Sequence, residues 1–225
     1  MPTVHHCANH ELNGNRLDRR FSRNERIYAA QGCTGNRHQP RPGLVDTLIA
    51  RCAIEPDFYV RDMLTWALTR YPPETTLPRL IAEVSSGSAQ ARSQALHTLS
   101  KIREHSAFSV ITRSLLYDAD DEVARSAWRA AVVLVPNEQR SELAEELAAQ
   151  FGRGGREVQL SLSRALLALG PEVLEPVLRR AIASDSPRVR AHAIATERLL
   201  RDPNAAFELA THEAKRQFAL KDRPA

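Results

Sequence analysis

The sequence has few aromatic residues and few residues that favour β-strands. Its 225 residues include six Phe, four Tyr and two Trp, whereas Ala and Leu together supply 58. A core built from Ala and Leu, with few β-branched side chains, favours helices packed closely on helices. This composition excludes a β-sandwich or a β-barrel and predicts an all-α fold.

Long apolar runs and cysteines are also scarce. The chain has no apolar run of about 18 residues, so we expect no membrane span. Its first residues lack the apolar stretch of a secretory signal. The three cysteines, Cys7, Cys33 and Cys52, are odd in number and irregularly spaced, which argues against a disulfide framework. We therefore expect a reducing, cytoplasmic setting.

The net charge of +4 is unevenly distributed. Residues 1–43 hold seven arginines and three acids, whereas residues 44–225 hold 24 basic and 24 acidic residues. The first segment is poor in apolar residues, which predicts a disordered basic arm. A short helix over residues 18–30 is the alternative, because Leu17, Phe21 and Tyr28 recur at roughly helical spacing. The remainder of the chain has no overall field that would attract nucleic acid.

From Gly43 onwards, apolar residues recur at helical spacing between short breaks. We expect about eleven helices and no strand. Three of the breaks contain a residue of a type that caps helix N-termini. These residues are Asp57, Asp120 or Asp121, and Ser186. Ser186 is followed by Pro187, which suits a first helical position. Proline also predicts where helices end, at Pro72-Pro73, Pro136, Gly170-Pro171 and Pro203.

Five segments of the chain align with one another without gaps. Their first residues lie 31, 32, 35 and 31 positions apart, and the segments are Val60–Leu64, Ala91–Ala95, Val123–Ala127, Val158–Leu162 and Val189–Ala193. The first residue of each segment and the residue four later lie on one helix face, so we expect both to be buried. A lone helical pair cannot bury both its faces, which predicts stacked pairs with a continuous core.

The pattern V-R-x-x-A is best kept in Val189–Ala193 and Ala91–Ala95. It resembles the HEAT-like repeat family, in the short form also seen in phycobilin-lyase-type repeats, over residues 44–203. The fourth unit departs from it with Gln159, and the third has its arginine one place late, at Arg125. The resemblance implies a right-handed α-solenoid of about five helical pairs over residues 44–220, with a C-terminal helix at 205–220 and a short tail at 221–225.

The resemblance also assigns roles to positions within each unit. The arginines at the motif's own position, Arg61, Arg92 and Arg190, are expected to be structural and to pair with acids of neighbouring units. In this family the second helix of each unit lines the concave surface. Positions two, six and nine after each motif start should share that face, which gives the candidate binding residues Asp62, Trp66, His97, Arg125, Arg129, Arg164 and Arg198.

Two features of this face leave alternatives open. Trp66 and Asp62 resemble the groove residues of HEAT-like DNA glycosylases. The simpler explanation is that Trp66 packs on a neighbouring helix and Asp62 pairs with an arginine. The arginines suit a phosphate or an acidic peptide. Alternatively, they form a solvated face that is neutralised by nearby acids, namely Asp118, Asp120, Asp121 and Glu157.

Signals of catalysis are weak. Cys7 with His10 and Cys33 with His38 are ligand types that suit zinc, but 22 residues separate the pairs, so we predict no metal site. The sequence has no Gly-rich phosphate loop and no nucleophile elbow, and we expect no cofactor. We therefore predict a non-catalytic scaffold or adaptor that binds another protein on its concave face. A HEAT-like DNA glycosylase, or another nucleic-acid-binding protein, is the alternative.

Overall fold

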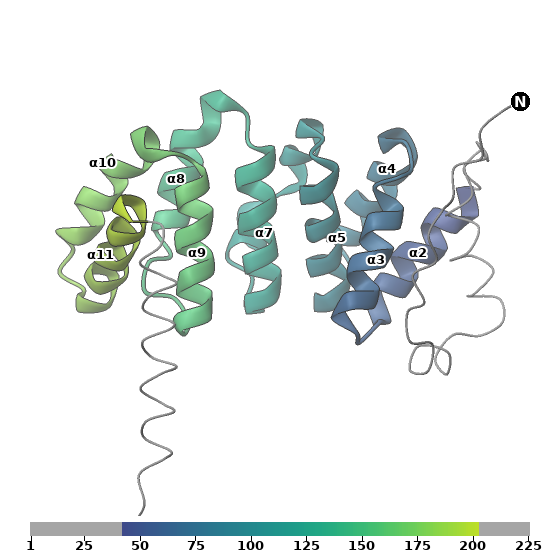
Figure 1. Ribbon diagram of the computed structural model, residues 1–225, viewed down its shortest axis with the longest axis horizontal. Helices are drawn as coiled ribbons and strands as arrows, with labels where there is room; N and C mark the ends of the chain where they lie inside the picture. Colours follow the sequence, from purple (N-terminus) through teal and green to yellow (C-terminus); the bar gives the residue numbers. More distant parts are fainter. Residues whose placement is uncertain (1–41, 203–225) are drawn as a thin grey trace, which may run out of the picture. The chain divides into compact units, whose positions relative to one another are not determined.

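The computed structural model describes residues 42–202, and all regular structure in this range is helical (Figure 1). The elements are, in chain order, α2 (Pro42–Ile54), α3 (Phe58–Leu68), α4 (Pro73–Val84), α5 (Ala89–Ile102), η1 (His105–Val110), α6 (Arg113–Leu116), α7 (Asp121–Leu134), η2 (Asn137–Gln139), α8 (Arg140–Ala148), α9 (Arg156–Ala168), α10 (Pro171–Ile182) and α11 (Pro187–Arg201). The expected arm lies outside the described residues except for its last two positions, as do the C-terminal helix and the tail. Among the described helices, none combines the length and the apolar character that a membrane span requires.

The helices stack as pairs in two layers. Helix α2 packs on α3, α4 on α5, α8 on α9 and α10 on α11, and the second helices of successive pairs also pack on one another, from α3 through α5, α7 and α9 to α11 (Figure 1). We call α3, α5, α7, α9 and α11 the second layer. All five aligned segments lie in it. This arrangement confirms the predicted all-α, HEAT-type solenoid.

The third pair is incomplete, because its first member is split into the 3-10 turn η1 and the single helical turn α6. Helix α5 ends at Ile102, and the residue that follows, Arg103, has a φ of 60° in the left-handed region.

Two hydrogen bonds hold the end of α6 in place. The indole Nε1 of Trp128 and the amide of Gln150 both donate to the carbonyl of Leu116 at 2.9 Å. These two bonds fix the short segment against α7 and the end of α8.

Side-chain caps start most second-layer helices where the sequence predicts them. Asp57, Asp120 and Ser186 are N-caps, and Pro187 is the first residue of α11. Asp57 Oδ1 accepts the backbone N–H of Tyr59 at 2.8 Å, which satisfies one of the N–H groups that a helix start leaves without a partner. The caps position the second layer relative to the turns that precede it.

Two of the prolines expected to end helices instead begin the next ones. Pro73 and Pro171 are the first residues of α4 and α10, a position where proline's fixed φ suits the helix and its missing N–H costs no hydrogen bond. Both helices carry a second proline five residues later, Pro78 and Pro176. Helices α4 and α10, each the first of its pair, therefore share this proline pattern.

The aligned segments supply the core between neighbouring second-layer helices. Ala127 and Ala193 have no exposed surface, and Ala95 is also buried, as predicted. At the first aligned position, the residues of the second, third and fourth units are buried, whereas Val60 and Val189 are half-buried. These two belong to the end units of the described array, where a neighbouring repeat covers the helix on one side only.

The motif arginines are structural, but their partners differ from the prediction. Arg61, Arg92 and Arg190 each donate to main-chain carbonyls five or six residues earlier, at 2.8 to 3.1 Å. Of these three arginines, only Arg92 also pairs with an acid of the next unit in the described range, Asp118 at 3.2 Å. A guanidinium with several donors suits this role, because the carbonyls of the preceding turn have no helical partner. Among residues 42–202, Arg61 and Arg190 therefore bind main-chain carbonyls and not the predicted acids.

The two units that depart from the motif preserve the same contact by other means. Gln159 replaces the arginine in the fourth unit, and its amide donates to the carbonyl of Gly154, five residues earlier, at 3.3 Å. In the third unit the motif position is the buried Ala124. There Arg153, from the turn before α9, donates to the carbonyl of Asp118 in the turn before α7 and also pairs with Asp121 at 3.0 Å.

Two buried polar clusters join second-layer helices with the same spacing. Between α3 and α5, the hydroxyl of Thr65 bonds the amide of Gln94 at 2.7 Å and lies 3.4 Å from the hydroxyl of Thr98. These partners are 29 and 33 residues away. Buried polar groups that are satisfied only in one arrangement fix the register of the two helices.

The second cluster lies between α9 and α11 and includes a histidine. Ser163 contacts His192 at 3.0 Å and Thr196 at 2.7 Å, again 29 and 33 residues away. The Nδ1 atom of His192 accepts the N–H of Gly152 at 3.0 Å, and Nε2 donates to the carbonyl of Gln159 at 2.9 Å. The ring is therefore neutral, and it ties α11 to the turn before α9.

We expect His192 to make stability depend on pH. Burial lowers the pKa of His192 below 6.5, against the opposing effect of the Gln159 carbonyl. The unfolded chain then binds the proton more readily, so stability is fully present above about pH 6.5 and is lost as the pH falls through the lower native pKa. Thermal unfolding followed by circular dichroism should show a falling midpoint over this range. His192→Gln should reduce the slope, whatever its midpoint at neutral pH, and an unchanged slope would contradict this role.

Substitutions on α11 test the register of the repeat. Ala193 is buried and Ala195, two residues later, is exposed. Ala193→Asp places an unpaired charge between helices and should lower stability by several kcal/mol, whereas Ala195→Asp should change it by about 0.5 kcal/mol or less. Ala127→Asp in α7 should behave like Ala193→Asp. Equal thermal midpoints for the two α11 variants would show that the register is wrong.

Candidate functional site

The seven residues predicted to bind a partner all lie on second-layer helices, and we call them the candidate face. Asp62, Trp66, Arg129, Arg164 and Arg198 are exposed, and His97 and Arg125 are half-buried. Their positions therefore agree with the helical spacing used to choose them, because the intervening positions carry the core. The structure brings residues of α3, α5 and α7 close together on this face.

His97 connects the acidic and the basic parts of the candidate face. Its Nε2 lies 3.9 Å from the Asp62 carboxylate, which is beyond hydrogen-bond distance. Burial lowers the pKa of His97, as do the charges of Arg129 and Lys101, while Asp62 acts in the opposite direction. Because the lowered pKa leaves the imidazole neutral at pH 7, its contact with Asp62 is a polar contact rather than an ion pair.

Helix α7 carries two arginines of different character. Arg125 pairs with Glu122 at 2.6 Å, within its own helix. Arg129 donates to the hydroxyl of Ser126 at 3.0 Å and has no acidic partner among the described residues. Burial lowers the pKa of Arg129, as does the neighbouring charge of Arg125, whereas Glu122 raises it. Arg129 is thus a partly desolvated cation without a counterion in this part of the chain.

Arg164 and Arg198 continue the candidate face on α9 and α11. Both are exposed, and no ion pair joins either to an acid within residues 42–202. Three of the four acids that could have neutralised the stripe are engaged elsewhere: Asp118 pairs with Arg92, Asp121 pairs with Arg153, and Asp120 caps α7, whereas Glu157 is exposed in the first turn of α9. Three arginines on three successive helices are therefore available to an external anion.

Trp66 is an exposed side chain with one occupied ring face. It is 49% exposed, so it is not buried against a neighbouring helix. The guanidinium of Arg70 lies over its ring, 4.9 Å from the centroid. A flipped base stacked on Trp66 would have to use the other face or displace Arg70. The position of Arg70 over the ring of Trp66 therefore adds no support to the alternative prediction of a DNA glycosylase.

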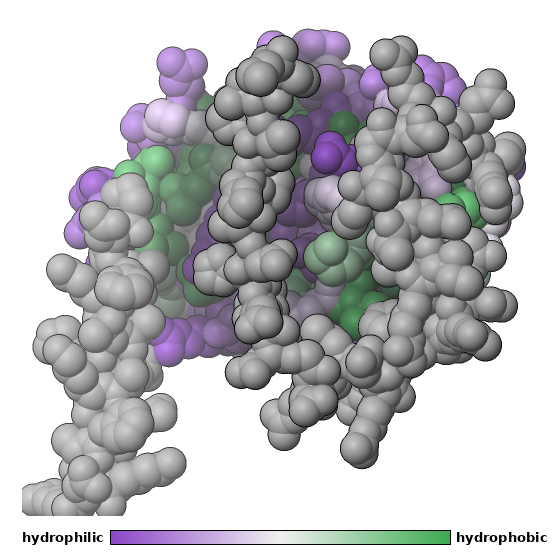
Figure 2. Space-filling view, turned by 45° about the vertical axis from the view of Figure 1, so that its right-hand side comes forward, coloured by the Kyte–Doolittle hydropathy of each residue, from purple (hydrophilic) through white to green (hydrophobic). Residues whose placement is uncertain are grey.

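Large apolar side chains are exposed around α3. Ile54, Phe58, Tyr59, Met63 and Trp66 are between 49% and 80% exposed, and we call them the α3 apolar patch. On the side of the protein shown in Figure 2, hydrophobic areas lie among hydrophilic ones. Of these five residues, only Trp66 was predicted from the sequence to be exposed on a binding face. The i, i+4, i+7 spacing of Tyr59, Met63 and Trp66 indicates that Tyr59 and Met63 share a helix face with Trp66. The same spacing is typical of a buried stripe, so it does not predict that this face is exposed.

The repeat itself explains why this patch is exposed. In the next unit, the positions that match Tyr59 and Met63 are Gln90 and Gln94. Gln90 donates to two carbonyls at the end of α2 and just beyond it, and Gln94 donates to Thr65 of α3. These positions thus face the preceding repeat. Helix α3 is the first second-layer helix of the described residues, so no preceding repeat covers it there.

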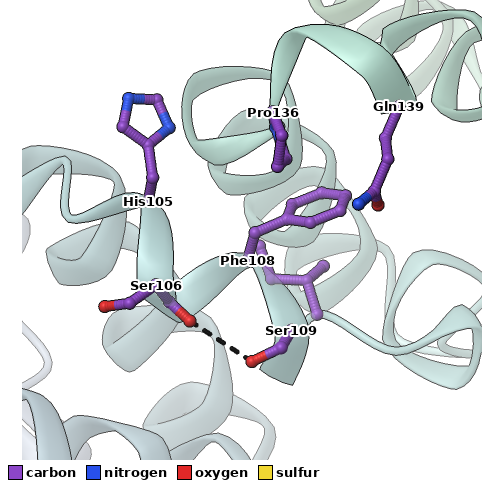
Figure 3. Close-up of a pocket in the computed structure, with 7 residues that line it drawn as sticks. His105, Ser106, Phe108, Ser109, Pro136 and Gln139 are labelled. Carbon is purple, nitrogen blue, oxygen red and sulfur yellow. Dashed lines mark hydrogen bonds between the residues drawn. The ribbon is translucent and has the colours of Figure 1, made fainter.

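A hollow of about 400 Å³ lies beside the incomplete third pair. Figure 3 shows Phe108 of η1 and Gln139 of η2 approaching each other across it. The hydroxyl of Ser109 donates to the carbonyl of Ser106 at 3.2 Å, and the Nδ1 of His105 lies 2.9 Å from the carbonyl of Leu134. The hydroxyl of Ser106 lies 3.5 Å from the Glu104 carboxylate, so no hydrogen bond joins His105 to either serine of the hollow.

Nor do the buried reactive groups form a catalytic site. Ser163 and His192 lie at the distance of a nucleophile and its base, but both are at most 3% exposed and His192 also bonds the main chain. Burial raises the pKa of Cys52 to about 12, against the smaller effect of Arg61, so its thiol stays protonated. No cluster of three metal-ligating side chains occurs in the described range. The arm residues considered for zinc lie outside it.

Comparison with known proteins identifies the repeats. Residues 45–131, from α2 into α7, match the family model for HEAT repeats. The resemblance inferred from the sequence is therefore confirmed, while its phycobilin-lyase-type subtype stays a prediction. No curated protein matches the chain.

The exposure of Trp66 can be measured in the full chain. The second tryptophan, Trp128, has no exposed surface, so an aqueous quencher such as acrylamide should reach Trp66 alone. We expect Trp66→Phe to remove the quenchable part of the emission and to leave circular dichroism unchanged. Quenching that is the same in both proteins would show that Trp66 is covered.

Proposed function

We propose that this HEAT-repeat protein is a non-catalytic scaffold that binds a segment of another protein along its candidate face. The observation that carries the proposal is a row of exposed arginines on successive helices, Arg129, Arg164 and Arg198, which have no acidic partner within residues 42–202. Such a row costs electrostatic free energy in the isolated protein, and an acidic partner would offset that cost. Among residues 42–202, none of the serine, histidine or cysteine side chains considered for catalysis offers another explanation for this row.

The second layer is a rigid support for binding. The side chains of the candidate face project from helices that are fixed by N-caps, by the motif arginines and by buried polar clusters. A surface that is already ordered loses little conformational entropy when a partner binds. Because each helix contributes one or two residues, a segment lying across the helices would contact several repeats at once.

Several features favour a protein over a nucleic acid. Asp62, at the α3 end of the candidate face, would repel a phosphate backbone that continued along the whole face. Residues 44–225 carry equal numbers of basic and acidic residues. The apolar side chains beside Trp66 suit a protein side chain better than a sugar–phosphate chain.

Selection of a random peptide library on the full chain tests the proposal. We expect families of peptides whose affinity falls at least about tenfold, or about 1.4 kcal/mol, on Trp66→Ala and on Arg129→Glu. Arg179→Glu is the matched control, because Arg179 is an exposed arginine of α10, outside the second layer. Selected peptides that bind all three variants equally, or failure to select any, would contradict the proposal.

A further inference from the structure

The chemical character of the second layer changes along the stack of helices. At α3 the exposed side chains are those of the α3 apolar patch. From α7 to α11 the exposed residues of the candidate face are arginines without acidic partners in the described range. His97 lies between the two parts, next to Asp62 on one side and within the field of Arg129 on the other.

We propose that the partner is an extended acidic segment with an apolar side chain at the end that binds α3. Its carboxylates would bind Arg129, Arg164 and Arg198, and its apolar side chain would pack on Met63 and Trp66. This inference rests on the proposed function and specifies the chemistry of the partner.

Arginine is well suited to this ligand. Its planar guanidinium donates two parallel hydrogen bonds to the two oxygens of one carboxylate. A ligand with a single acceptor atom cannot accept both bonds in this geometry. Arg129 donates to one serine hydroxyl, which leaves most of its N–H donors free for an external acceptor. The nearby positive charge of Arg125 disfavours the isolated cation, and a bound carboxylate would relieve this repulsion.

The spacing of the helices predicts the spacing of the acids. Packed helix axes lie about 8–10 Å apart, and an extended chain advances about 3.3 Å per residue. One helix step therefore corresponds to about three residues of the ligand. Acids that reach α7, α9 and α11 should lie at positions i, i+3 and i+6, and the apolar residue that reaches α3 should lie about six residues from the first acid.

A labelled synthetic peptide tests this spacing directly. It carries leucine at one end and three glutamates, the first about six residues away and the others at intervals of about three residues, with serine and alanine elsewhere. Fluorescence anisotropy with the full chain should show binding that weakens with added salt. Arg129→Glu and Arg164→Glu should each weaken it at least about tenfold, whereas Arg179→Glu should not.

Two control peptides separate sequence from net charge. One has the same composition with its glutamates adjacent, and the other has glutamine in place of glutamate. Both should bind at least about tenfold more weakly than the spaced peptide. Replacing the leucine by serine should also weaken binding, and that difference should disappear in Met63→Ala, because a double-mutant cycle isolates the contact between the two side chains.

The possible outcomes distinguish this inference from the function on which it rests. If library peptides depend on Trp66 and Arg129 but are not acidic, or if the control peptides bind as tightly as the spaced one, the acidic ligand is wrong and the scaffold function stands. Tighter binding of DNA through Arg129 and Arg164 would identify a nucleic-acid surface instead. If Met63→Ala changes the oligomeric state in sedimentation, the patch joins two copies and the apolar anchor is wrong.

Discussion

The close approach of neighbouring second-layer helices is the constraint on which the rest of the structure depends. Alanine at the buried aligned positions, as in Ala95, Ala127 and Ala193, leaves room for that approach and no room for a larger or charged side chain. Once the helices are stacked in this way, their remaining faces have fixed directions. The first and fifth positions of each aligned segment face the core. The positions two, six and nine after the segment start lie toward solvent.

Much of the fold could be predicted from the sequence because the repeat is visible in single residues. Asp57, Asp120 and Ser186 cap helices where their types and positions indicate, and the aligned segments all lie in one layer. The broken first helix of the third pair could not be predicted, since hydrophobic spacing does not separate a 3-10 turn from a helix. The carbonyl partners of Arg61 and Arg190 were also missed, because main-chain groups are not visible in a sequence.

The candidate face shows a similar limit. Helical spacing was enough to place its seven residues on the second layer, but it could not show which arginines lack a partner. That distinction depends on Asp118 and Asp121 being engaged by Arg92 and Arg153, contacts between units that only the folded chain reveals. For the same reason, Tyr59 and Met63 look like core residues in the sequence, although no repeat precedes α3 in the described range.

The two polar clusters with the same spacing have a consequence for folding fidelity. Thr65 and Ser163 each contact partners that lie 29 and 33 residues further along the sequence. The units that carry them therefore resemble each other enough to pair incorrectly, within one chain or between two chains. The middle of the array differs, because the buried Gln150, which follows α8, donates to the carbonyl of Leu116 in the preceding unit. A chain whose units had slipped by one repeat would bury this amide without that acceptor, so Gln150 penalises misaligned arrays.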